Sequence, residues 1–458
     1  MQANRFNARI SHWRDRILSE NSSLITASLL VGIVTGGCAS LLKLMINWIA
    51  LPFHALADPD KANYFFIALP VIGFLIVTAY QKYILHQDIY HGVDRMSDRL
   101  RNHNYDYSPR LILAPLFASS ITLGFGGSAG SEGPIASSGA AIGSNVGRIF
   151  RFPPQRIMVL IACGAGAGIA GIFKAPIGGA LFIIELFTLS LDSIALIALF
   201  TATISSALTA YLLSGGTPDI DFSTAVTFGV SDIRPIVAAG IFLGIYSTYY
   251  AAIMRHVGRM YSLIRTHWVR ALSSGLVVGV LIFLFPTLYG EGYNSVTQLL
   301  NNVPERIIQF SWVSSLIGTK ESAAYALLIF AILLLIVKPF ATSSTTDGGA
   351  VAGDYAPLLM IGSVAGFTFA YGANLLFGYQ LPVTGFVFLG MTGVMAGAIK
   401  APLMAIFLTV EMVAMPSMLL PAAAVSLLSY LTRLFFNSAP HFDSSGHNLW
   451  HGIRDIYK

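Results

Sequence analysis

The chain has 458 residues, of which 55% are hydrophobic and only 11% are charged, and its formal net charge is +5. Its mean hydropathy is +0.69. A soluble domain of this length exposes far more charge, so the composition indicates a polytopic membrane protein. The modest net charge argues against nucleic-acid binding. Cys38 and Cys163 lie in apolar, glycine-rich segments that suit neither a disulfide nor a metal site.

The chain divides into a basic start, two membrane halves and a polar tail. Residues 1–21 carry four arginines among apolar residues, which predicts an interfacial helix rather than a signal peptide and favours a cytoplasmic N-terminus. The two halves cover 22–214 and 233–436, with a loop at 215–232 between them. We expect the short polar tail, 437–458, to be cytoplasmic as well.

Apolar runs recur throughout both halves. The candidate spans are 22–53, 63–85, 110–125, 134–150, 157–172, 175–190, 192–214, 233–254, 270–286, 323–340, 355–375, 380–397, 399–413 and 417–436. Several are shorter than the roughly 20 residues that cross a bilayer. Short, glycine-interrupted segments indicate broken or tilted helices, which are tolerated only where freed backbone groups are buried in protein or line a watery cavity. The short spans therefore point to a permeation pathway.

The two halves carry the same motifs in the same order. Residues 164–185, GAGAGIAGIFKAPIGGALFIIE, align without a gap with 390–411, GMTGVMAGAIKAPLMAIFLTVE. Upstream, GSEGPIASSGAAIG at 130–143 aligns with GDYAPLLMIGSVAG at 353–366. Two membrane halves of one layout, each with a glycine-proline break, are typical of transporters and channels whose site lies at the interface between repeats.

The glycine-proline breaks have a defined chemistry. Glycines around Glu132 let several backbone N–H groups turn toward one point, and a proline in the first helical turn costs little. Each break thus predicts a helix N-terminus aimed into the membrane, where free N–H groups and a partial positive charge favour an anion. Two such ends converging would hold a small anion weakly enough to release it.

Glu132 is a carboxylate placed inside this predicted anion site. When ionised it would occupy the site itself, and when protonated it would leave, so it is a candidate for both gate and proton carrier. The alternative is a glutamate that only caps the helix start, where acidic residues are favoured. An ionisable group at membrane depth costs about 3 kcal/mol, and that cost favours the gating interpretation.

Taken together, the motifs resemble those of the chloride channel and chloride/proton antiporter (CLC) family over nearly the whole chain. GSEGP at 130–134 is similar to that family's Gly-Arg/Lys-Glu-Gly-Pro motif with serine in second place. GDYAP at 353–357 is similar to its Gly-x-Phe-x-Pro motif with tyrosine for phenylalanine. FPTLYGEGYNSV at 285–296 and KAPLMAIFLTVEM at 400–412 also match family stretches.

The resemblance implies an all-α inverted-repeat fold with about eighteen tilted or broken membrane helices. It also implies a homodimer of a bacterial-type protein in the inner membrane, with one chloride pathway per subunit, both termini in the cytoplasm, protons as a second partner and no cofactor. Glu132 takes the place of the external gating glutamate. The implied anion-binding residues surround the two breaks: Gly130, Ser131, Gly133, Gly353, Asp354, Tyr355 and Ala356.

Three positions depart from the family's anion pathway. The filter serine corresponds best to His91, which could donate a hydrogen bond to the anion or could be an ordinary polar loop residue. Asp354 replaces an aliphatic residue, so we expect its side chain to point away and only its N–H to be used. The family's inner tyrosine has no clean match, and His441 or Phe442 is the nearest candidate for an inner gate.

The proton route also departs from the family's pattern. In proton-coupled members a second glutamate follows the FIIE segment, and here Leu186 stands in its place. Glu185 either substitutes in a water-connected route or, as its repeat partner Glu411 suggests, bonds to loop amides, which is the role we favour. Lys174 and Lys400 either raise the positive potential along an anion route or extend to a helix boundary.

Several functions remain after this comparison. The leading prediction is chloride transport gated by Glu132, as chloride/proton antiport. The alternative is a passive voltage-gated or pH-gated chloride channel without proton coupling. A secondary transporter of an organic substrate would need more polar residues at mid-membrane. A membrane enzyme would need clustered His, Asp or Glu, and the sequence has no such motif.

Overall fold

The structure is a computed structural model, and it describes residues 20–56, 63–87, 89, 105–187, 192–216, 220, 228–229, 232–308, 311 and 320–438. The predicted interfacial helix at 1–21 and the predicted tail at 437–458 fall almost wholly outside this range. His91, His441 and Phe442, which we predicted for the filter and the inner gate, also lie outside the described residues.

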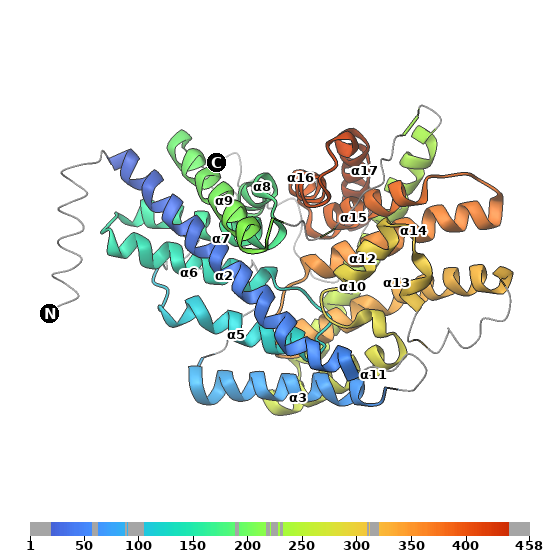
Figure 1. Ribbon diagram of the computed structural model, residues 1–458, viewed down its shortest axis with the longest axis horizontal. Helices are drawn as coiled ribbons and strands as arrows, with labels where there is room; N and C mark the ends of the chain where they lie inside the picture. The colour runs from blue at the N-terminus through green and yellow to red at the C-terminus, as the bar shows by residue number, and fades with distance from the viewer. Residues whose placement is uncertain are drawn as a thin grey trace.

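The described residues of the chain are α-helical apart from one π-helical segment, three short 3-10 helices, turns, loops and one isolated bridge. The first half contains α2 (Glu20–Leu56), α3 (Phe65–Ala79), α5 (Arg110–Gly124), α6 (Glu132–Ile149), α7 (Pro154–Phe173), α8 (Pro176–Phe187) and α9 (Ser193–Leu213). The second contains α10 (Ile233–Ser262), α11 (His267–Leu284), α12 (Tyr293–Leu300), α13 (Lys320–Thr346), α14 (Tyr355–Phe377), α15 (Val383–Ile399), α16 (Pro402–Val413) and α17 (Leu419–Ser438). Figure 1 shows most helices of each half gathered on one side, with α3 and α11 packed together across the boundary.

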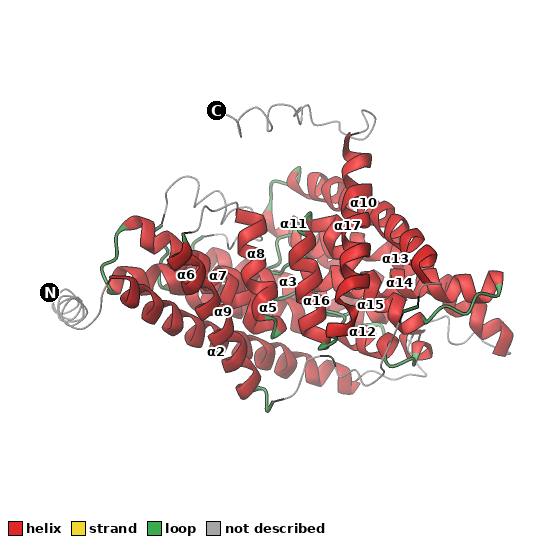
Figure 2. Cartoon of the chain, turned by 90° about the horizontal axis from the view of Figure 1, so that it is seen from above, coloured by secondary structure: helices red, strands yellow, loops and turns green. Residues whose placement is uncertain are grey.

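Helix lengths agree with the predicted mixture of full and broken spans. Within the described residues, nine helices are long and apolar enough to cross a membrane. The helices α8 and α16 have only 12 residues each, which span about 18 Å. These two short helices pack against each other, and both views of the molecule place them side by side (Figures 1 and 2). The broken segments therefore meet where the two halves join.

The sequence repeat is also a repeat of packing. Aligned glycines lie at the contact of α6 with α7 and of α14 with α15. A Cβ atom added at Gly139 would collide with the carbonyl oxygen of Gly164, and one added at Gly362 would lie 2.6 Å from the carbonyl oxygen of Gly390. Small residues let membrane helices approach closely without a hydrophobic driving force between them. The glycine pattern thus fixes the same helix pair in both halves.

The Lys-Ala-Pro motif is a helix break in both halves. Lys174 ends α7 with φ 54° and Lys400 ends α15 with φ 66°, both in the left-handed region. Pro176 and Pro402 then begin the next short helix, where proline is well tolerated. The two lysines therefore stand at helix boundaries, as one of the two interpretations of this motif required.

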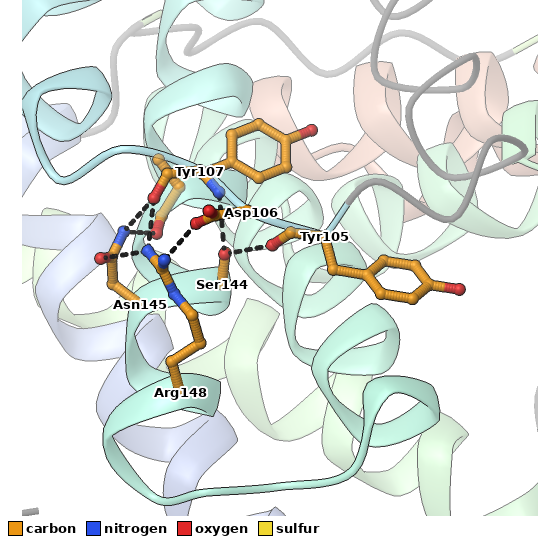
Figure 3. A network of polar contacts seen from close by, with 7 residues as sticks. Tyr105, Asp106, Tyr107, Ser144, Asn145 and Arg148 are labelled. Carbon is orange, nitrogen blue, oxygen red and sulfur yellow. Dashed lines mark hydrogen bonds and ion pairs between the residues drawn. The ribbon is translucent and has the colours of Figure 1, made fainter.

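The last turns of α6 are anchored to the chain that precedes α5. Arg148 forms an ion pair with Asp106 and donates to the carbonyl oxygen of Tyr107 at 2.5 Å. The Nδ2 of Asn145 donates to the same carbonyl at 3.2 Å, and the Tyr107 N–H donates to Ser144 Oγ at 3.3 Å. Figure 3 shows these side chains turned toward one another. The network holds the end of α6 opposite to Glu132.

We expect the substitution Gly362→Ala to lower the free energy of unfolding by about 1–3 kcal/mol, because an added methyl group overfills the α14–α15 contact. Gly37→Ala is the matched control, since nothing lies within 4 Å of a Cβ added in that turn of α2. The control should be neutral or stabilising by up to about 1 kcal/mol. Denaturant titration in detergent micelles measures both, and equal effects would contradict the packing role.

Candidate functional site

The two glycine-proline breaks are joined by backbone hydrogen bonds. The Gly130 N–H donates to the Gly353 carbonyl at 2.8 Å, and the Gly353 N–H donates back to the Gly130 carbonyl at 2.6 Å. The first residue of α6 is Glu132 and that of α14 is Tyr355, so the N-termini of both helices lie beside this bridge. The predicted convergence of two helix ends is therefore present.

The Glu132 side chain leaves its own helix and caps the partner helix. Its Oε1 accepts a short hydrogen bond from the Tyr355 N–H and a second, of 3.2 Å, from the Ala356 N–H. The residue is completely buried, and Oε2 has no hydrogen-bond partner among the described residues. The carboxylate oxygen thus stands at the positive end of α14, which is the place where a small anion would bind.

Close approach of backbone to carboxylate explains the glycines. A Cβ atom added at Gly353 would lie 2.7 Å from both Glu132 Oε1 and the Gly133 nitrogen, and one at Gly130 would overlap the carboxylate. No larger residue fits either position without moving the side chain of Glu132. The glycines of the two motifs therefore leave the space that the Glu132 carboxylate occupies.

Backbone N–H groups of the predicted anion-binding residues have partners in the structure. The N–H groups of Gly130 and Gly353 donate to each other's carbonyl oxygens and join the two helix ends, and that of Ser131 donates to Glu291. The N–H groups of Tyr355 and Ala356 donate to Glu132. Direct contacts of any of these residues with an anion stay predictions.

Lys338 is a member of the site that the motif comparison does not single out. It lies in α13, is completely buried, and interacts electrostatically with Glu132. Its Nζ donates to Ser128 Oγ at 2.9 Å, and the Ser128 N–H donates to Thr345 Oγ1 at 3.1 Å. A lysine within the apolar span 323–340 was the available signal, since ionisable residues at membrane depth are costly and usually functional.

Glu185 and Glu411 cap each other's neighbouring helix. Glu185 accepts from the N–H groups of Leu403 and Met404 at 3.0 and 2.7 Å, at the start of α16. Glu411 accepts from those of Ile177 and Gly178 at 3.1 and 2.8 Å, at the start of α8. This reciprocal pair is the amide-bonding arrangement that the repeat suggested. A role of Glu185 in proton transfer stays a prediction.

Leu186 is half-buried and packs against the apolar core. It follows Glu185 directly in α8, so the position at which the family resemblance predicts an inner glutamate is apolar here. An aliphatic side chain neither accepts nor donates a proton. Any proton that reaches Glu132 from that side therefore travels by another group or through water.

The fold and site together define a class of protein. It is an all-helical membrane protein built from two like halves, whose broken helices meet at a buried carboxylate, Glu132. The sequence profile of the family described as "Voltage gated chloride channel" matches residues 72–433. The chain belongs to this family.

Individual relatives agree with that assignment. The chain is 28% identical over 336 residues to the H(+)/Cl(−) exchange transporter ClcA of Salmonella arizonae, covering 70% of this chain and 66% of the relative. A slow cyanobacterial Cl−/H+ antiporter matches with a TM-score of 0.76 and 22% identity over 93% of this chain and 97% of its own. A CLC-type fluoride/proton antiporter matches with a TM-score of 0.72 and 22% identity over 90% and 96%. The predicted all-α CLC fold is confirmed.

We expect Glu411→Ala to lower the free energy of unfolding by about 1.5–3 kcal/mol, because two N–H groups at the start of α8 lose a charged acceptor. Glu305→Ala removes a solvent-exposed carboxylate instead and serves as control. Thermal and denaturant unfolding in detergent measure both. A loss no larger than that of the control would show that the caps contribute nothing to stability.

Proposed function

We propose that this protein carries chloride and other small monovalent anions across the membrane, with Glu132 as the gate. The observation that carries the proposal is the placement of Glu132 Oε1 on the N–H groups of Tyr355 and Ala356. A chloride ion offers these donors the same charge and a similar size. The names of the family and of its relatives supply chloride as the substrate.

The gate works by competition for one site. The structure places the Glu132 side chain at the positive end of α14. In its ionised form it fills this position and excludes an anion. Protonation neutralises the carboxylate, weakens its hold on the two N–H groups and lets the side chain leave. A chloride ion then takes its place, and loss of the proton returns the carboxylate. The proton that opens the site is thus available for exchange with the anion.

Lys338 takes part in this cycle through its electrostatic interaction with Glu132. Its positive charge lies within electrostatic range of the carboxylate and is held in place by Ser128. A fixed cation attracts whichever anion occupies the site, carboxylate or chloride, without contacting it. Selectivity between the two then rests on the proton, and not on Lys338.

The assembly and orientation follow the family pattern in our proposal. The protein is a homodimer with one anion pathway per subunit, in a bacterial inner membrane, with both termini in the cytoplasm. The arrangement of α8 and α16, each capped by a glutamate of the other, gives this region a fixed shape. Such rigidity suits a surface on which a second subunit packs.

Leu186 favours a second candidate function, chloride movement without proton exchange. The inner proton acceptor of coupled relatives is missing, and Glu185 is held by the amides of Leu403 and Met404. In that case Glu132 takes and returns its proton on one side of the membrane only. The gate is the same in both candidates, and only the path of the proton differs.

Glu132→Gln tests the gate. A neutral amide cannot be ionised, so chloride efflux from proteoliposomes should lose the part of its pH dependence that titration of Glu132 gives, whereas wild-type efflux should rise as pH falls and Glu132 gains its proton. Glu305 is an exposed carboxylate on η4 (Pro304–Ile308), and Glu305→Gln therefore controls for the change in net charge. A Glu132→Gln variant that keeps the wild-type response to pH would remove Glu132 from the gate.

Simultaneous recording of chloride efflux and proton uptake separates the two candidates. In the antiport version, an outward chloride gradient drives protons inward even when no proton gradient is applied. Glu132→Gln abolishes this uptake. Chloride flux that moves no protons in the wild type establishes the uncoupled version. The same assay with bromide, nitrate and fluoride tests anion selectivity, and no movement of any small anion would overturn the proposed function.

A further inference from the structure

A second carboxylate, Glu291, sits on the other helix end of the site. It lies in the loop between η3 (Pro286–Leu288) and α12. Its Oε1 accepts hydrogen bonds from both the N–H and the Oγ–H of Ser131, at 3.0 and 2.5 Å. Ser131 is completely buried and is the residue directly before Glu132 and α6. Glu291 therefore binds the donors that the N-terminus of α6 would otherwise offer to an anion.

The two carboxylates are arranged alike. Glu132 takes two donors at the start of α14, and Glu291 takes two donors at the start of α6. The helix ends they cap meet at the Gly130–Gly353 bridge, and the two negative charges repel each other across it. Each carboxylate is thus a tethered anion on one half of a paired anion-binding structure.

Glu291 is the member of this pair that solvent reaches. It is half-buried, whereas Glu132 is completely buried. A cavity of about 460 Å³ opens beside it, lined by polar residues that include Asn47, Asn294, Gln298 and Arg306. The order from solution inward is the cavity, Glu291, Ser131, Glu132 and the N–H groups of Tyr355 and Ala356. An ion using this mouth passes Glu291 before it meets Glu132.

Charged and titratable groups around Glu291 come from every neighbouring element. Tyr289 from the loop, Tyr293 from α12 and Arg306 from η4 line the cavity together with Glu291. Glu132 from α6 interacts electrostatically with both Glu291 and Asp354, and Lys43 from α2 lies over the Tyr293 ring. Lys43 lies 5.8 Å from the centre of the Tyr293 ring. Arg306 is solvent-exposed, so its charge is screened by water. Ionised Glu291 thus places a negative charge at this mouth beside the positive charges of Lys43 and Arg306.

We propose that Glu291 is a second gating carboxylate, on the solvent side of Glu132. When ionised, it occupies the Ser131 donors and closes the mouth to anions. When it takes a proton from solvent in the cavity, it releases them, and the Ser131 N–H and Oγ–H become an outer binding subsite for a small anion. This inference rests on the proposed function, because it assigns a further residue to the same pathway.

The substitution in the GSEGP motif fits this role. The family motif that GSEGP resembles has Arg or Lys at the place of Ser131, and a basic side chain there would add a positive charge. Here a neutral serine is paired with a carboxylate, so the charge at the mouth depends on whether Glu291 holds a proton. The outer gate formed by Glu291 and Ser131 therefore responds to the pH of the solution, whereas a permanently charged side chain would not.

Chloride flux in proteoliposomes tests the proposal, with the same pH on both sides, varied from about 4.5 to 7.5 to cover glutamate titration in proteins. Glu291→Gln should raise wild-type flux at neutral pH by about tenfold, the factor that one hydrogen bond to a charged group represents. Added to Glu132→Gln, it should also flatten the pH dependence of chloride flux that this variant retains. Glu291→Asp keeps the charge but shortens the reach to Ser131, so its flux should rise as well.

Controls separate the possible failures. Glu305→Gln removes one exposed carboxylate from η4, close in the chain to Arg306, and should leave flux and pH profile unchanged. If wild-type protein moves no chloride, the proposed function fails. If wild type moves chloride and Glu132→Gln alters its pH profile, but both Glu291 variants match Glu305→Gln, the inference alone is overturned. A lower unfolding temperature of the Glu291 variants with wild-type flux would likewise reduce Glu291 to a helix cap.

Discussion

The backbone bridge between Gly130 and Gly353 is the contact on which the rest of the structure depends. It joins segments far apart in the chain and brings the N-termini of α6 and α14 together inside the protein. Helix ends buried without partners are costly, because their N–H groups have no acceptor. Here carboxylates supply the acceptors, Glu132 for α14 and Glu291 for α6. This pairing of carboxylates with helix ends is the basis on which we propose two anion sites.

The same principle recurs where the two halves meet through α8 and α16. Glu185 and Glu411 close the starts of these helices reciprocally, but neither is released in the proposed cycle. The difference lies in the surroundings. Glu132 is hemmed in by glycines, has one oxygen without a hydrogen-bond partner among the described residues, and lies near Lys338. In our proposal, carboxylates thus serve as permanent caps in one place and as gates in another.

Many features of the fold and site were predictable from the sequence, because each of them occurs once in each half of the chain and the two copies can be compared. The Lys-Ala-Pro breaks, the aligned glycines and the convergence of GSEGP with GDYAP follow from matching the halves, and the structure contains all of them. The roles of Lys338 and Glu291 were not predictable in this way. Neither has a counterpart in the other half, and both act through contacts that span 160 residues or more of chain. The use of Gly130 and Gly353 as a clamp likewise depends on a pairing that no local pattern specifies.

The central claim is that the Glu132 carboxylate and a permeant anion compete for the N–H groups of Tyr355 and Ala356. An experimental structure of Glu132→Gln soaked in bromide, beside wild type at neutral pH, tests it most directly through the anomalous signal of the ion. We predict a bromide peak within hydrogen-bond distance of both nitrogens in the variant and none there in wild type. A variant without bromide at these nitrogens, or a wild type that holds bromide and the carboxylate there together, would contradict the claim.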